Sequence, residues 1–180
     1  MAAVTLTEAK AHLNISTSST ADDTELAAFI DVAQALVEAE VGPLAATTCT
    51  DSFDGGTDLL LLTRGPVVSV TSVKVAGSTA SSTSYDVAGQ YLRSSAGPFG
   101  GGLGEVVVTY SAGHTSAAHL QLGRHATLEL LRHLWATQRG TMAGRNPFSG
   151  DEAPASAGAG WSMPNRVREL LRPLRAPGVA

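Results

Sequence analysis

The stretch GPFGGGLG, residues 97–104, is the strongest candidate for ligand chemistry in the chain. Clustered glycines can bring backbone N–H groups close to a phosphate. A dinucleotide loop needs G-x-G-x-x-G between a strand and a helix, but counting from Gly100 the last position holds Glu105. No lysine follows to complete an ATP-binding loop, and the next segment, EVVVTY, has a strand pattern. We therefore expect no cofactor, and predict a hairpin loop joining QYLRS to EVVVTY.

Metal and catalytic chemistry are not supported by the remaining polar residues. His125, Glu129 and His133 share a helix face, but the two histidines lie about 12 Å apart along its axis, too far for one ion with bonds of about 2 Å. There is no G-x-S-x-G elbow, and Cys49 falls in a predicted strand, where a small buried residue fits better than a nucleophile. Asp22 and Asp23 fit the start of a helix. We expect no metal site, and a protein that is not an enzyme.

The elements around these residues indicate an α+β fold. The capping-box spacing of Thr5 and Glu8 predicts a helix over residues 5–13, and apolar spacing of three and four predicts others over 22–41 and 116–139. These helices form an N-terminal pair and a long C-terminal-half helix packed together. An antiparallel β-rich insertion, one sheet or a small barrel, occupies residues 47–110 between them. In VVSVTSVKV the alternation slips, which predicts a bulge or a bend near Thr71–Ser72.

The chain divides by composition into three parts. We expect a core domain over residues 1–140, a flexible linker over 141–162, rich in Gly, Ala, Pro and Ser, and a C-terminal docking arm over 163–180. The arm contains the short amphipathic segment PNRVRELLRPL. A helix of that length is marginal alone and needs a surface on which to dock.

Charge is distributed unevenly, although the net charge is only -4. Acids dominate residues 1–60, where Lys10 is the one base, whereas arginines dominate residues 114–180. Such asymmetry can orient subunits or partners. Aromatic residues make up 5% of the chain, which disfavours a stacking single-strand nucleic-acid binder. No apolar run is long enough for a membrane span and no signal peptide is evident, so we expect no membrane partner.

The order of short motifs resembles that of a known family. The motifs are RGPVVSV over 64–70, VTYSAG over 108–113, Leu134–Trp135, and Arg139–Gly140. An acidic helix pair precedes them and PNRVRELL follows. This arrangement resembles the head-tail connector (head-completion or adaptor) proteins of tailed bacteriophages, in the form found in phages of actinobacteria.

The resemblance implies a structural virion protein at the head-tail interface, assembled in the host cytoplasm. Such proteins form a ring, commonly of twelve subunits, beneath the portal protein. A tail-side connector or tail terminator protein docks below the ring, and double-stranded DNA passes through it without sequence-specific binding. They often stay monomeric until they meet the portal. The alternative that we keep is a non-catalytic adaptor that docks through its C-terminal arm and forms no ring.

Three groups of residues are candidates for assembly contacts. For portal or partner docking by the arm they are Trp161, Met163, Arg166, Val167, Arg168, Leu170, Leu171, Arg172 and Leu174. For a flexible assembly loop they are Pro98, Phe99, Gly100, Gly101, Gly102 and Leu103. For a channel wall that repels DNA they are the acids Asp22, Asp23, Glu25 and Asp31.

Overall fold

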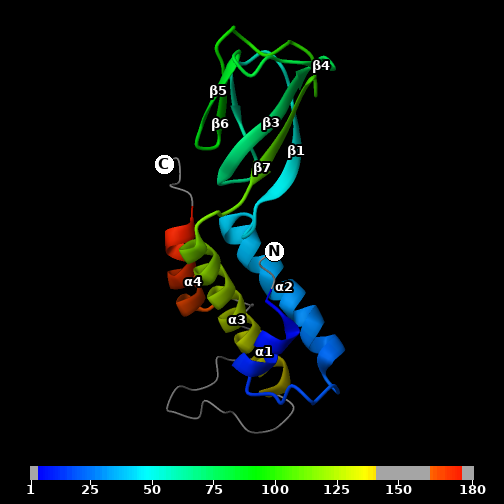
Figure 1. The fold of residues 1–180 in the computed structure, drawn as a ribbon, viewed down its shortest axis with the longest axis vertical. Helices are drawn as coiled ribbons and strands as arrows, with labels where there is room; N and C mark the ends of the chain where they lie inside the picture. The colour runs from blue at the N-terminus through cyan, green and yellow to red at the C-terminus, as the bar shows by residue number, and fades with distance from the viewer. Residues whose placement is uncertain (1–3, 141–162, 176–180) are drawn as a thin grey trace, which may run out of the picture. The chain divides into compact units, whose positions relative to one another are not determined.

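The computed structural model describes residues 4–140 and 163–175, with the side chains of 139 and 140 excepted. The described residues separate into two compact units (Figure 1). We call the first the β unit; it contains Glu38–Leu120 together with the segment that begins at Leu174. The second, the helical unit, contains the described parts of Ala2–Val37 and Gln121–Pro173. The fold class is therefore α+β, as the sequence predicts.

Four helices lie close to their predicted positions. They are α1 (Leu6–His12), α2 (Asp23–Val41), α3 (Ala117–Gly140) and α4 (Asn165–Leu171), the last followed by a 3-10 turn, Arg172–Leu174. The predicted capping box begins α1, because the Thr5 hydroxyl accepts from the Glu8 N–H while the Glu8 carboxylate accepts from the Thr5 N–H. The longer helices α2 and α3 also bury apolar residues against their neighbours, and such packing supplies most of the stability of helices in proteins.

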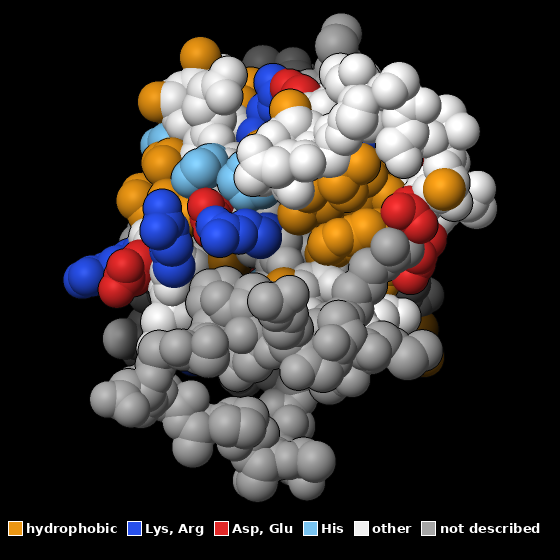
Figure 2. Space-filling view, turned by 90° about the horizontal axis from the view of Figure 1, so that it is seen from below, with side chains coloured by type: hydrophobic (Ala, Val, Ile, Leu, Met, Phe, Trp, Pro, Cys, Tyr) orange, Lys and Arg blue, Asp and Glu red, His pale blue; other side chains and the backbone are white. Residues whose placement is uncertain are grey.

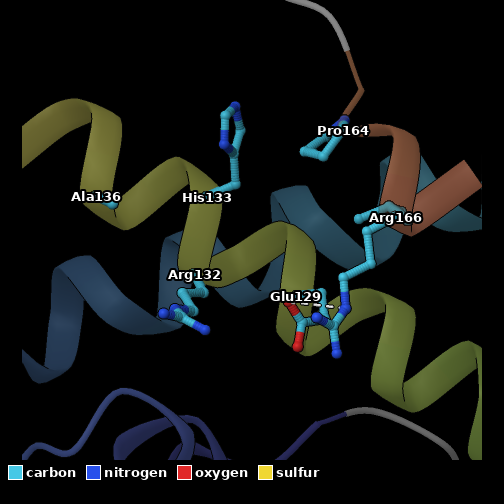
Figure 3. Close-up of a pocket in the computed structure, with 7 residues that line it drawn as sticks. Glu129, Arg132, His133, Ala136, Pro164 and Arg166 are labelled. Carbon is cyan, nitrogen blue, oxygen red and sulfur yellow. Dashed lines mark ion pairs between the residues drawn. The ribbon is translucent and has the colours of Figure 1, made fainter. Parts of the chain in front are cut away.

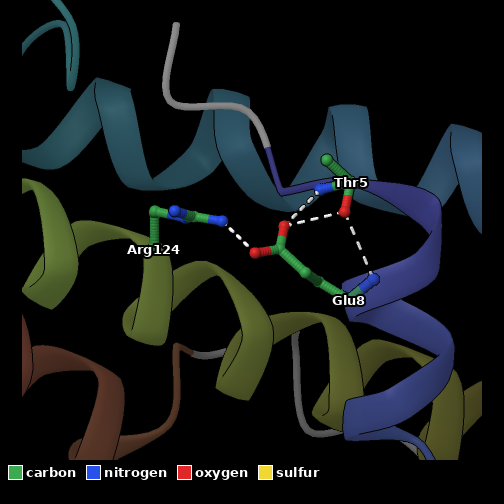
Figure 4. Close-up of polar contacts among 3 residues, drawn as sticks. All are labelled: Thr5, Glu8 and Arg124. Carbon is green, nitrogen blue, oxygen red and sulfur yellow. Dashed lines mark hydrogen bonds and ion pairs between the residues drawn. The ribbon is translucent and has the colours of Figure 1, made fainter.

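The core of the helical unit is built from one apolar face of each helix. α3 lies between α2 and α4 in this unit (Figures 1 and 4). Phe29 of α2 meets Trp135 of α3 edge to face, with ring centroids 5.9 Å apart. The buried apolar residues of the unit are Val4, Ala9, Leu26, Ile30, Ala33, Val37, Ala126, Leu130, Leu131, Met163, Val167 and Leu171.

Seven strands form two antiparallel sheets in the β unit. They are β1 (Thr47–Phe53), β2 (Leu59–Leu61), β3 (Val67–Val75), β4 (Ser78–Thr79), β5 (Tyr85–Ala88), β6 (Tyr91–Ser94) and β7 (Val106–Ala112). The strand orders are β1-β7-β3-β4 in one sheet and β2-β6-β5 in the other. A common core of buried residues joins the sheets, with Leu60 and Leu92 from the smaller and Val73, Val106 and Val108 from the larger. The insertion is therefore a two-sheet sandwich.

The predicted bulge in β3 is present. Its register against β7 shifts between Val70 and Ser72, and again between Val67 and Ser69. The second shift was not predicted, because Val67 and Ser69 fit an ordinary alternating strand. Both shifts let β3 follow β7 while Val67, Val70, Val73 and Val75 lie on the core side, whereas Val68 is 45% exposed.

One prediction is wrong: residues 97–104 do not form a hairpin loop. β6, which precedes them, belongs to the smaller sheet, whereas β7, which follows, is the central partner of β1 and β3 in the larger. The glycine segment therefore crosses from one sheet of the sandwich to the other. Adjacent strands in sequence pair often, but not always, so the pattern of the two strands could not show this.

No helix among the described residues is long and apolar enough to span a membrane.

Candidate assembly surfaces

The crossing segment is tied down by the carboxylate that follows it. Glu105 Oε2 accepts hydrogen bonds from the backbone N–H groups of Gly101 at 3.0 Å and Gly102 at 2.7 Å. These two bonds hold the pKa of Glu105 below its ordinary value. These two backbone N–H groups, which the sequence suggested as possible phosphate donors, thus donate to Glu105 of the same chain.

Neighbouring contacts join the segment to the turn after β1. Gly104 N–H donates to Asp54 Oδ1 at 2.7 Å, and Gly55 N–H donates to the Gly102 carbonyl at 2.8 Å. Phe99 is buried in the sandwich core, whereas Leu103 is 90% exposed. The segment presents one large apolar side chain to solvent from a hydrogen-bonded base. Its flexibility during assembly stays a prediction.

A shallow cleft of about 230 Å³ lies between α3 and α4 (Figure 3). Polar side chains lie along it: Arg132 and His133 come from α3, and Arg166 comes from α4. Arg166 Nε lies 3.9 Å from Glu129 Oε2, an ion pair that joins the two helices. Arg166 remains 71% exposed, so most of its guanidinium is open to a partner.

Glu129 is also the meeting point of two histidines. Its Oε1 lies 4.0 Å from His12 Nε2 and 3.8 Å from His125 Nε2. Burial lowers the pKa of His12, against the attraction of Glu129, so the neutral ring is favoured. The described residues contain no group of three or more His, Cys, Asp or Glu that could hold a metal ion. The arrangement is one of polar contacts between helices.

Two further ion pairs connect the short α1 to its neighbours. Glu8 accepts from both the Thr5 N–H and hydroxyl, which lower its pKa, and its other oxygen meets Arg124 of α3 (Figure 4). Lys10 is buried, with its Nζ 2.5 Å from Asp23 Oδ1 and 2.7 Å from the Ser19 carbonyl. The sequence places Lys10 on a short helix without showing that it is buried, because its partner lies thirteen residues later.

The structure divides the residues predicted for the docking arm into two sets. Trp161 lies outside the described residues. Met163, Val167, Leu171 and Leu174 are buried, and Leu170 is partly buried. The surface that α4 needs is therefore supplied by α3 of the same chain. Arg166, Arg168 and Arg172 remain exposed, and they are the part of the arm that can reach a partner in this conformation.

The four acids predicted for a channel wall also have different surroundings. Asp23 is paired with Lys10. Asp22 is partly buried, whereas Glu25 and Asp31 are exposed on α2. Their position on a DNA channel stays a prediction.

Sequence reasoning missed a second apolar face on α2. Val32 is 49% exposed, and Ala28 and Ala35 are exposed beside it. These residues repeat at three-and-four spacing on the side of the helix opposite Leu26, Ile30 and Ala33. The spacing of Ala28, Val32 and Ala35 was visible in the sequence. The larger apolar residues of the buried face gave a stronger pattern, so we assigned the helix a single apolar face.

Comparisons with known proteins give a match in fold. No family model matches the chain, and no curated protein matches it. A chain from the neck of an empty gene transfer agent (GTA) particle, computed with C6 symmetry, matches with 19% identity and a TM-score of 0.62, covering 99% of this chain and 92% of that one. A chain from the neck of the native particle, computed with C12 symmetry, has 18% identity, a TM-score of 0.63 and coverages of 99% and 91%.

A third match agrees with these two. A chain from the virion of the native gene transfer agent particle has 18% identity and a TM-score of 0.61, covering 99% of this chain and 92% of that one. The likeness extends over nearly the whole chain, so it includes both the helices and the β sandwich. The chain thus has the same fold as proteins found in the necks and virions of gene transfer agent particles.

Proposed function

We propose that this chain is a structural subunit of the junction between the head and tail of a phage-like particle. The observation that carries the proposal is the shared fold, over 99% of the chain, with proteins from particle necks. The motif order that resembles phage head-tail connectors supports the same role independently of the fold. The role needs surfaces for other proteins, and the exposed arginines of α4, the exposed face of α2 and Leu103 offer them.

Within this role, copies of the chain form a ring beneath the portal protein, and DNA passes through the ring to the tail. The rotational symmetry of the neck structures supports a ring, and twelve is the number expected for a connector. The chain acts by positioning proteins, without catalysis.

Electron microscopy of the chain mixed with the portal protein of its own particle tests the proposal. We expect a closed ring of density on one face of the portal, and none when the chain is omitted. A single copy bound to the portal without ring closure would favour the adaptor without a ring. Absence of any binding to the portal would contradict the proposal.

A further inference from the structure

The helical unit carries opposite charges on its two outer helices. Between Lys10 and Arg64 the chain contains no lysine or arginine, so all of α2 lacks a positive side chain. In α4 and the turn that follows, Arg166, Arg168 and Arg172 accompany a single acid, Glu169. Arg132 of α3, one of the residues that line the cleft between α3 and α4, is exposed as well.

These two surfaces lie on opposite sides of α3. α2 packs on α3 through Phe29 and Trp135, and α4 packs on it beside Glu129. In Figure 2 most Lys, Arg and His side chains, with some acids among them, lie to the left, whereas acids lie at the right edge. A compact unit with different surfaces on opposite sides suits head-to-tail association, which closes into a ring when the rotation allows.

The exposed face of α2 also has the form of a contact surface. Ala28, Val32 and Ala35 form an apolar strip, and Glu25 and Asp31 lie on its two sides. Small side chains let another helix approach closely, while charges at the edges fix the orientation more than they add affinity.

We infer that the exposed face of α2 binds the arginine surface of α3 and α4 in a second copy of this chain. The second copy is the partner whose charge fits: it presents arginines where the first presents Glu25 and Asp31. This inference rests on the proposed ring, and it identifies the contact between neighbouring subunits. It moves Glu25 and Asp31 from the channel wall, where the sequence led us to expect them, to the subunit contact.

Charge exchange tests the inference. The first variant, E25R/D31R, makes α2 basic, and the second, R168E/R172E, makes α4 acidic. Each alone places like charges against each other, so self-association should weaken at least about tenfold. An equimolar mixture restores opposite charges at every contact, so association should return. Sedimentation velocity over a concentration series with the portal protein present, at low and physiological salt, measures both effects, because the resemblance implies that the chain stays monomeric without the portal.

Two controls separate charge effects from folding and from the wider proposal. Asp86→Arg changes an exposed acid of the β unit and should leave association unchanged. Circular dichroism checks that each variant is folded. A fourfold variant carrying both pairs of changes on one chain should associate on the portal without a second variant, as we expect of the wild type.

The outcomes distinguish this contact from the ring itself. If the wild type forms a ring on its portal and both charge variants do so equally well, the contact is wrong while the ring stands. If folded variants fail singly and the mixture also fails, the contact is likewise wrong. If the wild type forms no ring, the proposed function fails, and recovery of association in the mixture would still support the contact.

Discussion

The two units satisfy their acidic side chains differently. In the helical unit, carboxylates meet positive or protonatable groups: Asp23 meets Lys10, Glu8 meets Arg124, and Glu129 meets Arg166 and two histidines. In the β unit, the acids with short contacts mostly accept from neutral donors. The exposed pairs Arg93–Asp58 and Arg175–Glu40 are its exceptions.

Asp51 is the clearest case in the β unit. Its Oδ2 accepts from the Tyr110 hydroxyl at 2.7 Å and from the Thr63 hydroxyl at 2.7 Å and N–H at 3.0 Å. Tyr110 in turn accepts from the Arg64 N–H at 3.0 Å. Burial alone would raise the pKa of Asp51, but these hydrogen bonds hold it below its ordinary value.

The difference indicates separate physical roles. Ion pairs between helices are weakened by salt and can be exchanged for pairs with another molecule. Hydrogen bonds from neutral donors within a sandwich are directional and local, so they fix the shape of a loop or strand. The helical unit is therefore the part suited to charge-directed assembly, and the β unit is the part suited to holding a fixed form.

Removing the buried lysine should have the largest effect on stability. Lys10→Met leaves Asp23 without its cation, and should lower the free energy of unfolding by roughly 2–3 kcal/mol, less than for a fully buried pair because Asp23 is 28% exposed. Urea denaturation measures the change. Lys74→Met, at an exposed position in β3, is the matched control and should change little.

A second substitution tells whether the cost arises from the unpaired acid. Adding Asp23→Asn to Lys10→Met removes the charge that was left behind, so part of the loss should be recovered. If Lys10→Met unfolds at the same urea concentration as the wild type, the pair does not hold α1 to α2.

Removing the Tyr110 hydroxyl should have a smaller effect, confined to the β unit. Tyr110→Phe leaves Asp51 with fewer donors and the Arg64 N–H without its acceptor, at a cost of about 1–2 kcal/mol. Because the donor is neutral, added salt should barely change this loss. Tyr85→Phe, at a partly buried position, is the matched control.

The same network predicts a pH dependence with a definite sign. An aspartate whose pKa is lowered on folding stabilises the protein above its unfolded pKa of about 3.9, and that contribution is lost as pH falls through the folded value. Wild-type stability should therefore fall below about pH 4, and more steeply than that of Tyr110→Phe. Equal slopes for the two proteins would show that Tyr110 does not set the pKa of Asp51.

Local signals explain which parts of the fold could be predicted. The Thr5–Glu8 box, the glycine and proline breaks and the slip near Thr71 each act within a few residues, so α1 and the bulge in β3 were confirmed. The pairing of Asp51 with Tyr110 joins residues 59 positions apart, and the passage from β6 to β7 changes sheets. Those features depend on which strands meet, and alternation within one strand does not contain that information.

For the candidate surfaces too, some features follow from local sequence and others depend on contacts between distant residues. The spacing of Val167 and Leu171 predicts correctly that α4 needs an apolar surface, but it is equally compatible with a partner and with α3 of the same chain. In the structure, α3 of the same chain supplies the surface on which α4 packs. Arg166, Arg168 and Arg172 lie next to these residues and face outward for the same helical reason, so their exposure could be predicted.

The smallest effect is expected in the glycine segment, and it tests whether neutral donors fix local shape. Glu105→Ala removes the acceptor for the Gly101 and Gly102 N–H groups, while the sandwich core stays intact. We expect faster hydrogen exchange at these two amides and an unchanged unfolding midpoint, with little influence of salt.

Gly101→Ala is the matched backbone variant, because an added Cβ at Gly101 meets no atom within 4 Å, whereas one at Gly100 would lie 2.6 Å from Glu105 Oε2 at a φ of +50°. It should keep the Glu105 hydrogen bonds and exchange slowly. If Glu105→Ala leaves exchange unchanged, the segment is held by Asp54 and the Phe99 anchor instead. If Glu105→Ala also lowers the unfolding midpoint, the carboxylate stabilises the whole sandwich. The hydrogen bonds from neutral donors would then do more than fix local shape at this position.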